Sequence, residues 1–238
     1  MSLPLFLVTS LPEGGSCTLD GPEGHHAATV QRLRVGEELV LSDGQGGTAT
    51  AVVTAAGRGS LELQIINRGY AEAPSPRLVV IQGIAKGERG ELAVQAMTEV
   101  GVDEIVPWAA ARSVAQWRGE RGDRSRDRWV STAREAAKQA RRAWLPVVAP
   151  AASTREAAAR ATLVLHEEAK ERLATVDLPA DAGEIALVVG PEGGITPEEV
   201  AAFEAAGARP VRLGDAVLRT STAGTAALAV LSTRLGRW

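Results

Sequence analysis

The most distinctive stretch of the sequence is a glycine-rich turn that follows an apolar run. Val188-Val189 leads into Gly190-Pro191-Glu192-Gly193-Gly194, and Thr196 then precedes Pro197 and two glutamates. Threonine as N-cap, proline at the first helical position and acids in the first turn are usual signals of a helix start. In open α/β sheets ligands bind at the carboxyl ends of strands, and glycine lets them approach the backbone. The turn matches neither the P-loop nor the dinucleotide pattern, so by itself it also fits a plain strand–helix connection.

A second polar loop, Leu213 to Thr220, follows the next apolar run of the chain. It leads into an apolar helix and places Arg219 between an apolar residue and a run of hydroxyl side chains. A single loop arginine is usually only solvated. Two loops that follow two parallel strands, however, meet at one edge of a sheet and form a pocket. The two loops together therefore predict a ligand site at that edge.

A basic segment lies between residues 112 and 142. It holds nine arginines and one lysine against four acids, whereas the whole chain has a net charge of −3. A concentrated basic segment on a near-neutral chain is typical of phosphate binding. The alternative is a solvated helix face that carries its own ion pairs.

Composition narrows the possible functions. Aromatic residues make up 3% of the 238 residues, which argues against a surface of stacked rings for single-stranded nucleic acid. The single cysteine, Cys17, excludes an intrachain disulfide and a cysteine zinc site. His25 and His26 are adjacent, so they cannot both face one ion, and we expect no metal. The first ten residues lack a signal-peptide pattern, and no apolar stretch reaches the ~20 residues that a membrane span needs. We expect a cytoplasmic protein.

The first 72 residues are predicted to form a small β-barrel. Short apolar runs, some with a period of two, are separated by glycine-containing turns such as Asp43–Gly47, and residues 25–33 are predicted to form a short helix. Ala73-Pro74-Ser75-Pro76 then favours an extended linker. From residue 73 onward, buried apolar strands alternate with helices. The strands are predicted at 78–81, 105–108, 147–148, 162–165, 185–189 and 211–213, and the helices at 88–100, 128–142, 154–161, 197–206 and 222–235. This pattern predicts an α/β domain with a parallel sheet that is covered on both faces.

The pairing of Gly190–Gly194 with Leu213–Ala223 resembles the RsmE family, the 16S rRNA uracil-N3 methyltransferases of the SPOUT superfamily. Further matches run along essentially the whole chain, and they include His25-His26, Arg32–Gly36, Lys86-Gly87, Thr98–Val102, Arg112–Val114 and Arg141-Arg142. Each piece alone is weak, but the combination is specific.

The resemblance implies a PUA-like barrel in residues 1–72 and a SPOUT methyltransferase domain in residues 73–238, with a deep trefoil knot near the C-terminal end. It further implies S-adenosylmethionine as cofactor, 16S rRNA of the small ribosomal subunit as substrate, and a homodimer. By analogy, the cofactor-binding residues are Leu165, His166, Glu167, Gly190, Glu192, Gly193, Gly194, Leu213, Gly214, Leu218 and Thr220.

The chemistry implied by the resemblance requires the proton of uridine N3 to be lost. The family commonly has an acid where this chain has Ser221, which leaves the base unassigned. We predict that Arg219 stabilises the uracil anion and that Glu192 or a water takes the proton. The predicted RNA-binding residues are His25, Arg32, Arg34, Lys86, Arg112, Arg141 and Arg142.

Two other functions remain open from the sequence. One is a SPOUT enzyme that methylates a ribose 2′-hydroxyl, because the Gly190–Gly194 turn occurs there too. The other is a non-catalytic RNA-binding assembly factor, which Ser221 favours. Cofactor binding distinguishes the assembly factor from the enzymes, and the methylated product distinguishes the enzymes from each other.

Overall fold

The computed structural model describes residues 3–179 and 182–238. The chain divides into two compact units. The N-terminal unit comprises residues up to Ala73 together with Ala137–Leu145, and the C-terminal unit comprises Pro74–Ala136 and Pro146–Trp238. The sequence-based division at residue 72 does not anticipate that residues 137–145 belong with the first unit.

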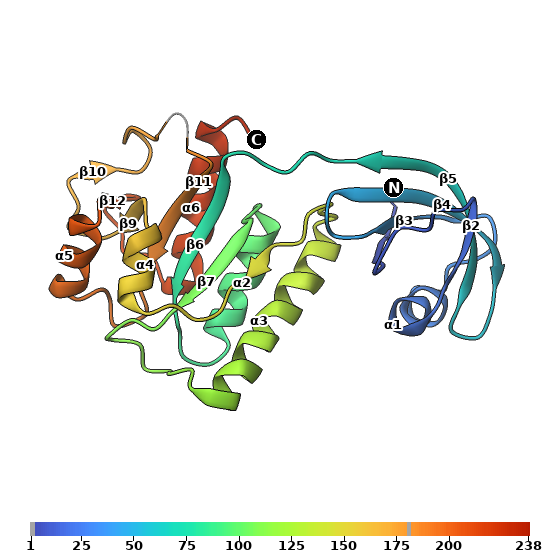
Figure 1. Ribbon diagram of the computed structural model, residues 1–238, viewed down its shortest axis with the longest axis horizontal. Helices are drawn as coiled ribbons and strands as arrows, with labels where there is room; N and C mark the ends of the chain where they lie inside the picture. Colours follow the sequence, from blue (N-terminus) through green and yellow to red (C-terminus); the bar gives the residue numbers. More distant parts are fainter. Residues whose placement is uncertain (1–2, 180–181) are drawn as a thin grey trace. The chain divides into compact units, whose positions relative to one another are not determined.

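The N-terminal unit is built on a five-stranded sheet with the order β1-β3-β4-β5-β2. Its strands are β1 (Leu5–Leu7), β2 (Ser16–Leu19), β3 (Glu38–Ser42), β4 (Gly47–Ala56) and β5 (Leu61–Tyr70). Ala49, Ala51 and Val53 alternate inward along β4, as a half-buried strand requires. Two register shifts between β4 and β5 bend this pair, and the curvature of both strands is visible in Figure 1.

A short helical segment lies between β2 and β3. It consists of α1 (Gly21–His25) and one turn of π-helix, η1 (His26–Val30). The sequence pattern predicted a helix over residues 25–33, so the helix begins earlier and ends earlier than expected. Pro22 stands in the first turn of α1, where its missing N–H costs no hydrogen bond.

Residues 137–145 join the N-terminal unit through specific contacts. Lys138 Nζ lies 2.8 Å from Glu23 Oε1, and this ion pair is largely buried. Trp144 Nε1 donates to the Ala71 carbonyl at 2.8 Å, and the backbone of Leu145 donates to Gly44. These partners are far apart in sequence, which is why local patterns did not predict them.

The C-terminal unit is built on a seven-stranded parallel sheet with the order β10-β12-β9-β11-β6-β7-β8. Its strands are β6 (Arg77–Gly83), β7 (Glu104–Trp108), β8 (Val147–Val148), β9 (Leu163–Leu165), β10 (Glu171–Arg172), β11 (Glu184–Val189) and β12 (Arg209–Arg212). The sequence pattern predicted all of these except β10, which has only two exposed residues and therefore no apolar signal.

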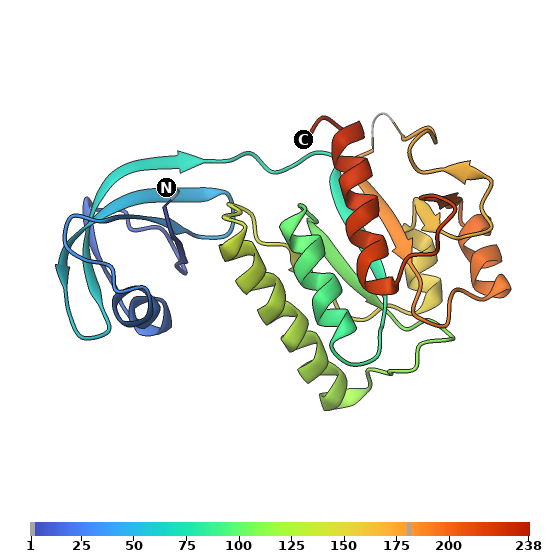
Figure 2. The ribbon, with the colours of Figure 1, turned by 180° about the vertical axis from the view of Figure 1, so that it is seen from behind.

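Helices cover both faces of this sheet. One face carries α2 (Arg89–Glu99), α3 (Gly119–Gln139) and α6 (Thr220–Arg234), and the other carries α4 (Thr154–Arg160) and α5 (Pro197–Ala205). Figure 2 shows α2, in green, beside α6, in red, in front of the strands.

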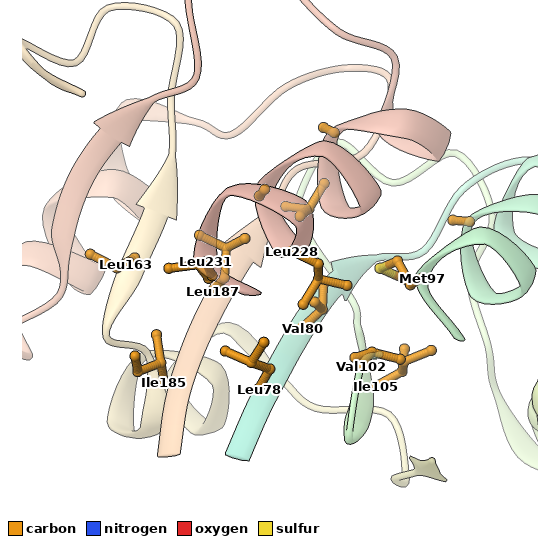
Figure 3. Packing of buried hydrophobic residues seen from close by; sticks show 14 of the residues in the cluster. Leu78, Val80, Met97, Val102, Ile105, Leu163, Ile185, Leu187, Leu228 and Leu231 are labelled. Atoms are coloured by element: carbon orange, nitrogen blue, oxygen red, sulfur yellow. The ribbon is translucent and has the colours of Figure 1, made fainter. Parts of the chain in front are cut away.

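The double coverage explains the continuous apolar runs of the central strands. Leu78 and Val80 of β6 pack with Met97 of α2 and Leu228 of α6, as Figure 3 shows, whereas Val79 and Ile81 pack into the cluster on the opposite face. After its first residue every position of β6 is buried, so alternation disappears from the sequence. The parallel α/β sheet predicted from the sequence is confirmed.

Helix α3 begins well before the residue 128 expected from its apolar pattern. Its first turns are rich in arginine and contain Gly122. Arginine gives no apolar signal and glycine disfavours a helix, so the sequence pattern does not predict this part of α3. Gly122 is needed there because a Cβ would lie 2.8 Å from the backbone of Trp117. Within the described ranges, no helix has the length and apolarity to cross a membrane. The trefoil knot stays a prediction.

Candidate active site

A cavity of about 530 Å³ opens at the carboxyl ends of β9, β11 and β12 in the C-terminal unit. Three loops line it, namely residues 165–167 after β9, residues 190–195 after β11 and residues 212–220 at the end of β12, together with Arg89 and Arg112. Every residue predicted to bind the cofactor lies in this lining. The loops therefore meet at one edge of the sheet, as predicted from the sequence. The cofactor role of each residue stays a prediction.

The glycine turn is shaped by close packing. A Cβ on Gly193 would lie 2.9 Å from Arg112 Cβ and 3.0 Å from the Arg112 carbonyl oxygen, and one on Gly190 would lie 2.8 Å from Ile195 Cγ1. Gly194 has a φ of +75°, which side chains disfavour. Larger residues would push these segments apart, so the glycines allow the turn to fold tightly beside the cavity.

The helix start after this turn is built as the sequence predicted. Thr196 and Glu199 form a reciprocal capping box at the first turn of α5. The buried Glu199 carboxylate also accepts hydrogen bonds from the Ala111 amide at 2.8 Å and the Thr154 hydroxyl at 3.2 Å. It thereby fixes the backbone next to Arg112, whose Nη1 donates to the Gly193 carbonyl at 3.2 Å.

Glu192, one of the two predicted catalytic residues, lies in the cavity lining with one carboxylate oxygen engaged. Its Oε1 accepts from Arg89 Nη1 at 3.3 Å and from the Lys86 amide at 3.2 Å. Sequence reasoning missed Arg89. The only signal was its position in the first turn of a predicted helix, where a cation is less usual than an acid.

Arg219, the other predicted catalytic residue, is the N-cap of α6 and lines the same cavity. The next residue, Thr220, is buried, and its hydroxyl donates to the Gly190 carbonyl at 2.7 Å. Ser221 is also buried, with 5% of its surface exposed, and is not among the lining residues. The serine that replaces the common acid therefore faces the protein interior rather than the cavity.

The predicted RNA-binding residues divide between the two units. Five of them belong to the N-terminal unit, and they are His25, Arg32, Arg34, Arg141 and Arg142. Lys86 and Arg112 belong to the C-terminal unit, and Arg112 lines the cavity. All but Arg142, which is partly buried, are exposed.

Part of the basic segment serves the fold. Arg126 donates to the carbonyls of Val148 and Ala149, Arg128 pairs with Glu91, and Lys138 pairs with Glu23. The exposed arginines 118, 121 and 141 present charge to solvent, whereas the exposed Arg124 lies 3.8 Å from Glu120. Structural contacts therefore account for part of the segment, and phosphate binding by its exposed arginines stays a prediction. Among residues 3–179 and 182–238, no three histidine, cysteine or acidic side chains gather as metal ligands.

The parallel sheet with a pocket at its strand ends and the curled β unit correspond to two known domain families, which define the class of protein as an RNA methyltransferase. Residues 71–232 match the model of an RNA methyltransferase domain, and residues 19–66 match that of an RNA methyltransferase PUA domain.

Relatives narrow this class to one family. The chain is 48% identical to ribosomal RNA small subunit methyltransferase E of Mycobacterium tuberculosis, over 98% of this chain and 93% of the relative, and 27% identical to that of Bacillus subtilis, over 93% and 91%. A crystal structure of the Neisseria gonorrhoeae enzyme bound to S-adenosylmethionine superposes with a TM-score of 0.86, at 30% identity and 98% coverage of both chains. A putative methyltransferase from Legionella pneumophila in complex with the same cofactor also gives 0.86, at 26% identity and 98% coverage of both chains. The chain belongs to the ribosomal RNA small subunit methyltransferase E family, RsmE, of RNA methyltransferases.

Proposed function

We propose that this chain transfers a methyl group from S-adenosylmethionine to N3 of a specific uridine in 16S rRNA of the small ribosomal subunit. The observation that carries the proposal is the cavity at the ends of β9, β11 and β12, whose lining contains residues of both RsmE-like motifs. Family membership and the cofactor-bound structural relatives support the choice of cofactor and of RNA as substrate.

The cavity fits the proposed cofactor in size and in the character of its walls. Its volume of about 530 Å³ lies within the range of small-molecule sites. Apolar side chains such as Leu165, Ile195 and Leu213 suit an adenine ring, while Glu167 and the glycine backbone offer partners for polar groups. When bound, S-adenosylmethionine supplies an electrophilic methyl group on a sulfonium.

The residues of the chain have to remove a proton and orient the uracil. Arg219 lines the cavity, and its proposed role is to stabilise negative charge on the uracil oxygens. Glu192 lines the same cavity and is the candidate proton acceptor, either directly or through a water. Its contacts with Arg89 and the Lys86 amide hold the carboxylate in one orientation. Positioning then supplies much of the remaining acceleration, because methyl transfer needs in-line geometry.

RNA recognition is assigned to exposed basic residues of both units. Arg32, Arg34 and Arg141 of the N-terminal unit contact phosphates of structured rRNA, and Arg112 acts at the cavity. One uridine is splayed out of its helix so that N3 reaches the cavity. We include a homodimer and a cytoplasmic location in the proposal, both on the resemblance to SPOUT enzymes. Sedimentation at several concentrations tests the dimer.

The decisive experiment is methyl transfer from labelled S-adenosylmethionine to small ribosomal subunits from cells that lack this gene, with the product nucleoside identified by mass spectrometry. We expect 3-methyluridine at one site. A 2′-O-methyl product would instead assign the chain to a ribose-modifying activity. Binding of cofactor and subunits without transfer would support the assembly-factor function, which Ser221 favours.

A further inference from the structure

We propose that Gln82 is a positioning residue that sets the geometry of the cofactor cavity without contacting the cofactor. The inference rests on the proposed function, since it concerns the S-adenosylmethionine site. Gln82 is the penultimate residue of β6, and its side chain is fully buried although it is polar. A buried polar side chain needs partners, and Gln82 Nε2 has two, the carbonyl of the neighbouring Gly83 at 3.2 Å and Thr220 in a loop of the cavity.

A chain of two hydrogen bonds runs from Gln82 to both principal loops. Gln82 Nε2 donates to Thr220 Oγ1 at 2.8 Å, and Thr220 Oγ1 donates to the Gly190 carbonyl at 2.7 Å. A carbonyl can only accept, so the single hydroxyl hydrogen of Thr220 is committed to Gly190. Thr220 must therefore accept from Gln82, and only the NH₂ side of the amide can provide that donor.

The end of β6 also contacts the glycine turn directly. A Cβ on Gly83 would lie 2.5 Å from the nitrogen of Pro191 and 2.9 Å from the carbonyl carbon of Gly190. The backbone of β6 thus packs tightly against the turn to which Thr220 is hydrogen-bonded. Gln82 and Gly83 are not among the residues that line the cavity, so β6 supports the two loops from behind.

This arrangement changes the role expected of Thr220. Its hydroxyl hydrogen serves Gly190, so Thr220 contributes to cofactor binding by tying its own loop to the glycine turn. Gln82 orients that hydroxyl and thereby fixes the separation of the loops. A cavity that is formed in advance binds more tightly, because the ligand does not have to order it.

Gln82→Met tests the proposal with little expected damage to the fold. The Oε1 atom of Gln82 is buried and has no hydrogen-bond partner among the described residues, so methionine removes this unsatisfied oxygen together with the donor. Removal of the unsatisfied oxygen partly offsets the loss of the two hydrogen bonds that Nε2 donates to Gly83 and Thr220, whereas the orientation of Thr220 is lost. We expect a melting temperature near that of the wild type and S-adenosylmethionine affinity about tenfold weaker.

Titration calorimetry of the full-length protein with S-adenosylmethionine provides the measurement. Gln64→Met is the matched control, since Gln64 also donates from Nε2 but to the Gly15 carbonyl of the N-terminal unit, at 2.7 Å. Its cofactor affinity should equal that of the wild type. At saturating cofactor, the rate of methyl transfer by Gln82→Met should approach that of the wild type. The KM for the cofactor should therefore rise more than kcat falls. Cofactor affinity within twofold of the wild type in Gln82→Met would overturn the proposal.

Variants of Thr220 complete the test. Thr220→Val removes the hydroxyl and should weaken cofactor binding, whereas Thr220→Ser keeps it and should restore most of the affinity. The double variant Gln82→Met/Thr220→Val should bind about as weakly as Thr220→Val, because both changes break one path. Fully additive effects would contradict the inference. If Gln82→Met failed to fold, equal losses in the valine and serine variants of Thr220 would still contradict it. A wild-type protein that binds no S-adenosylmethionine would instead refute the proposed function.

Discussion

Arg219 and Glu192 reach one cavity from two different loops, which is the arrangement that charge stabilisation and proton removal require. The roles proposed for residues of this cavity can be told apart by the kinetic effect of mutating them. A residue that stabilises developing charge acts mainly on the chemical step, whereas a residue that holds the cofactor acts mainly on its affinity.

We predict that Arg219→Ala lowers the rate of methyl transfer by about 10²-fold or more while it leaves S-adenosylmethionine affinity within a few-fold of the wild type. Single-turnover transfer to small subunits and calorimetry measure the two effects. Arg155→Ala, an exposed arginine on α4, is the control and should be silent in both assays. Full turnover by Arg219→Ala with normal RNA binding would show that the assigned role is wrong.

Two arginines adopt a backbone conformation that glycine usually occupies. Arg32 and Arg141 have φ values of 56° and 54°, and they are the non-glycine residues with positive φ in the described part of the chain. Arg141 follows the end of α3, where Arg142 N donates to the Ala137 carbonyl at 2.9 Å, the hydrogen bond of a helix C-terminal motif that favours glycine. Both arginines belong to the predicted RNA-binding set, although glycine would fit the backbone conformation of each position with less strain.

Arg141→Gly should therefore separate stability from RNA binding. We expect the free energy of unfolding to rise by about 0.5–1 kcal/mol, because the left-handed conformation no longer carries a Cβ. RNA affinity should fall, and the salt slope of binding should decrease by about one unit. Urea unfolding and filter binding at several salt concentrations measure these changes. Arg155→Gly within helix α4 should instead destabilise the protein, and unchanged RNA binding in Arg141→Gly would remove Arg141 from the interface.

At the scale of elements, an ion-pair network joins the amino ends of the strands, opposite the edge that carries the cavity. Arg160 of α4 contacts Glu104 of β7 at 2.6 Å and Glu184 of β11 at 2.7 Å, and Arg77 of β6 contacts Glu104 at 2.7 Å. Hydrogen bonds from Arg160 lower the pKa of both carboxyl groups below the usual value, and Arg77 lowers that of Glu104 further, against the opposing effect of burial. The network thus links strands β6, β7 and β11 and helix α4 by ion pairs.

This network predicts how stability depends on pH. A carboxyl group whose pKa is lower in the folded state stabilises the fold fully above its unfolded pKa of about 4.3, and this contribution is lost as the pH falls through the lower folded value. We expect Arg160→Met to cost about 1–3 kcal/mol at pH 7 and progressively less toward pH 3. Urea unfolding at pH 7, 5, 4 and 3 tests the trend. A constant difference between variant and wild type would show that the network does not titrate as assigned.

At the scale of the whole molecule, the chain builds two units from interleaved segments. Residues 137–145 belong to the N-terminal unit, whereas the rest of the basic segment belongs to the C-terminal unit. The cavity is lined only by residues of the C-terminal unit. Cofactor binding and phosphate contacts at Arg141 and Arg142 should therefore be separable by mutation.

The double change Arg141→Glu/Arg142→Glu tests this separation. RNA affinity should fall, and its dependence on salt should flatten, because fewer counterions are released on binding. S-adenosylmethionine affinity should stay at the wild-type value. Binding to rRNA fragments between 50 and 200 mM salt, as typical conditions for such slopes, measures the first effect. An unchanged salt slope would contradict a phosphate contact at these positions.

The sequence alone determined the features that local chemistry encodes. Threonine, proline and acids at 196–199 define a helix start, the continuous apolar run at 78–81 indicates a strand buried on both faces, and the motifs at 190–194 and 213–223 identify the family. These signals depend on neighbouring residues, so a linear pattern carries them. They were enough to predict the parallel α/β sheet and the loops that line one cavity.

Only the tertiary structure decided which distant residues meet. Gln82 and Thr220 are 138 positions apart, Lys138 and Glu23 are 115 apart, and Arg89 reaches Glu192 across 103 positions. No local preference of either residue specifies such a partner, because the pairing depends on the order of strands in the sheet and on which side chains are buried together. For the same reason, the sequence predicted a place for Thr220 in the cofactor site but not the hydrogen bond by which its hydroxyl joins the two loops.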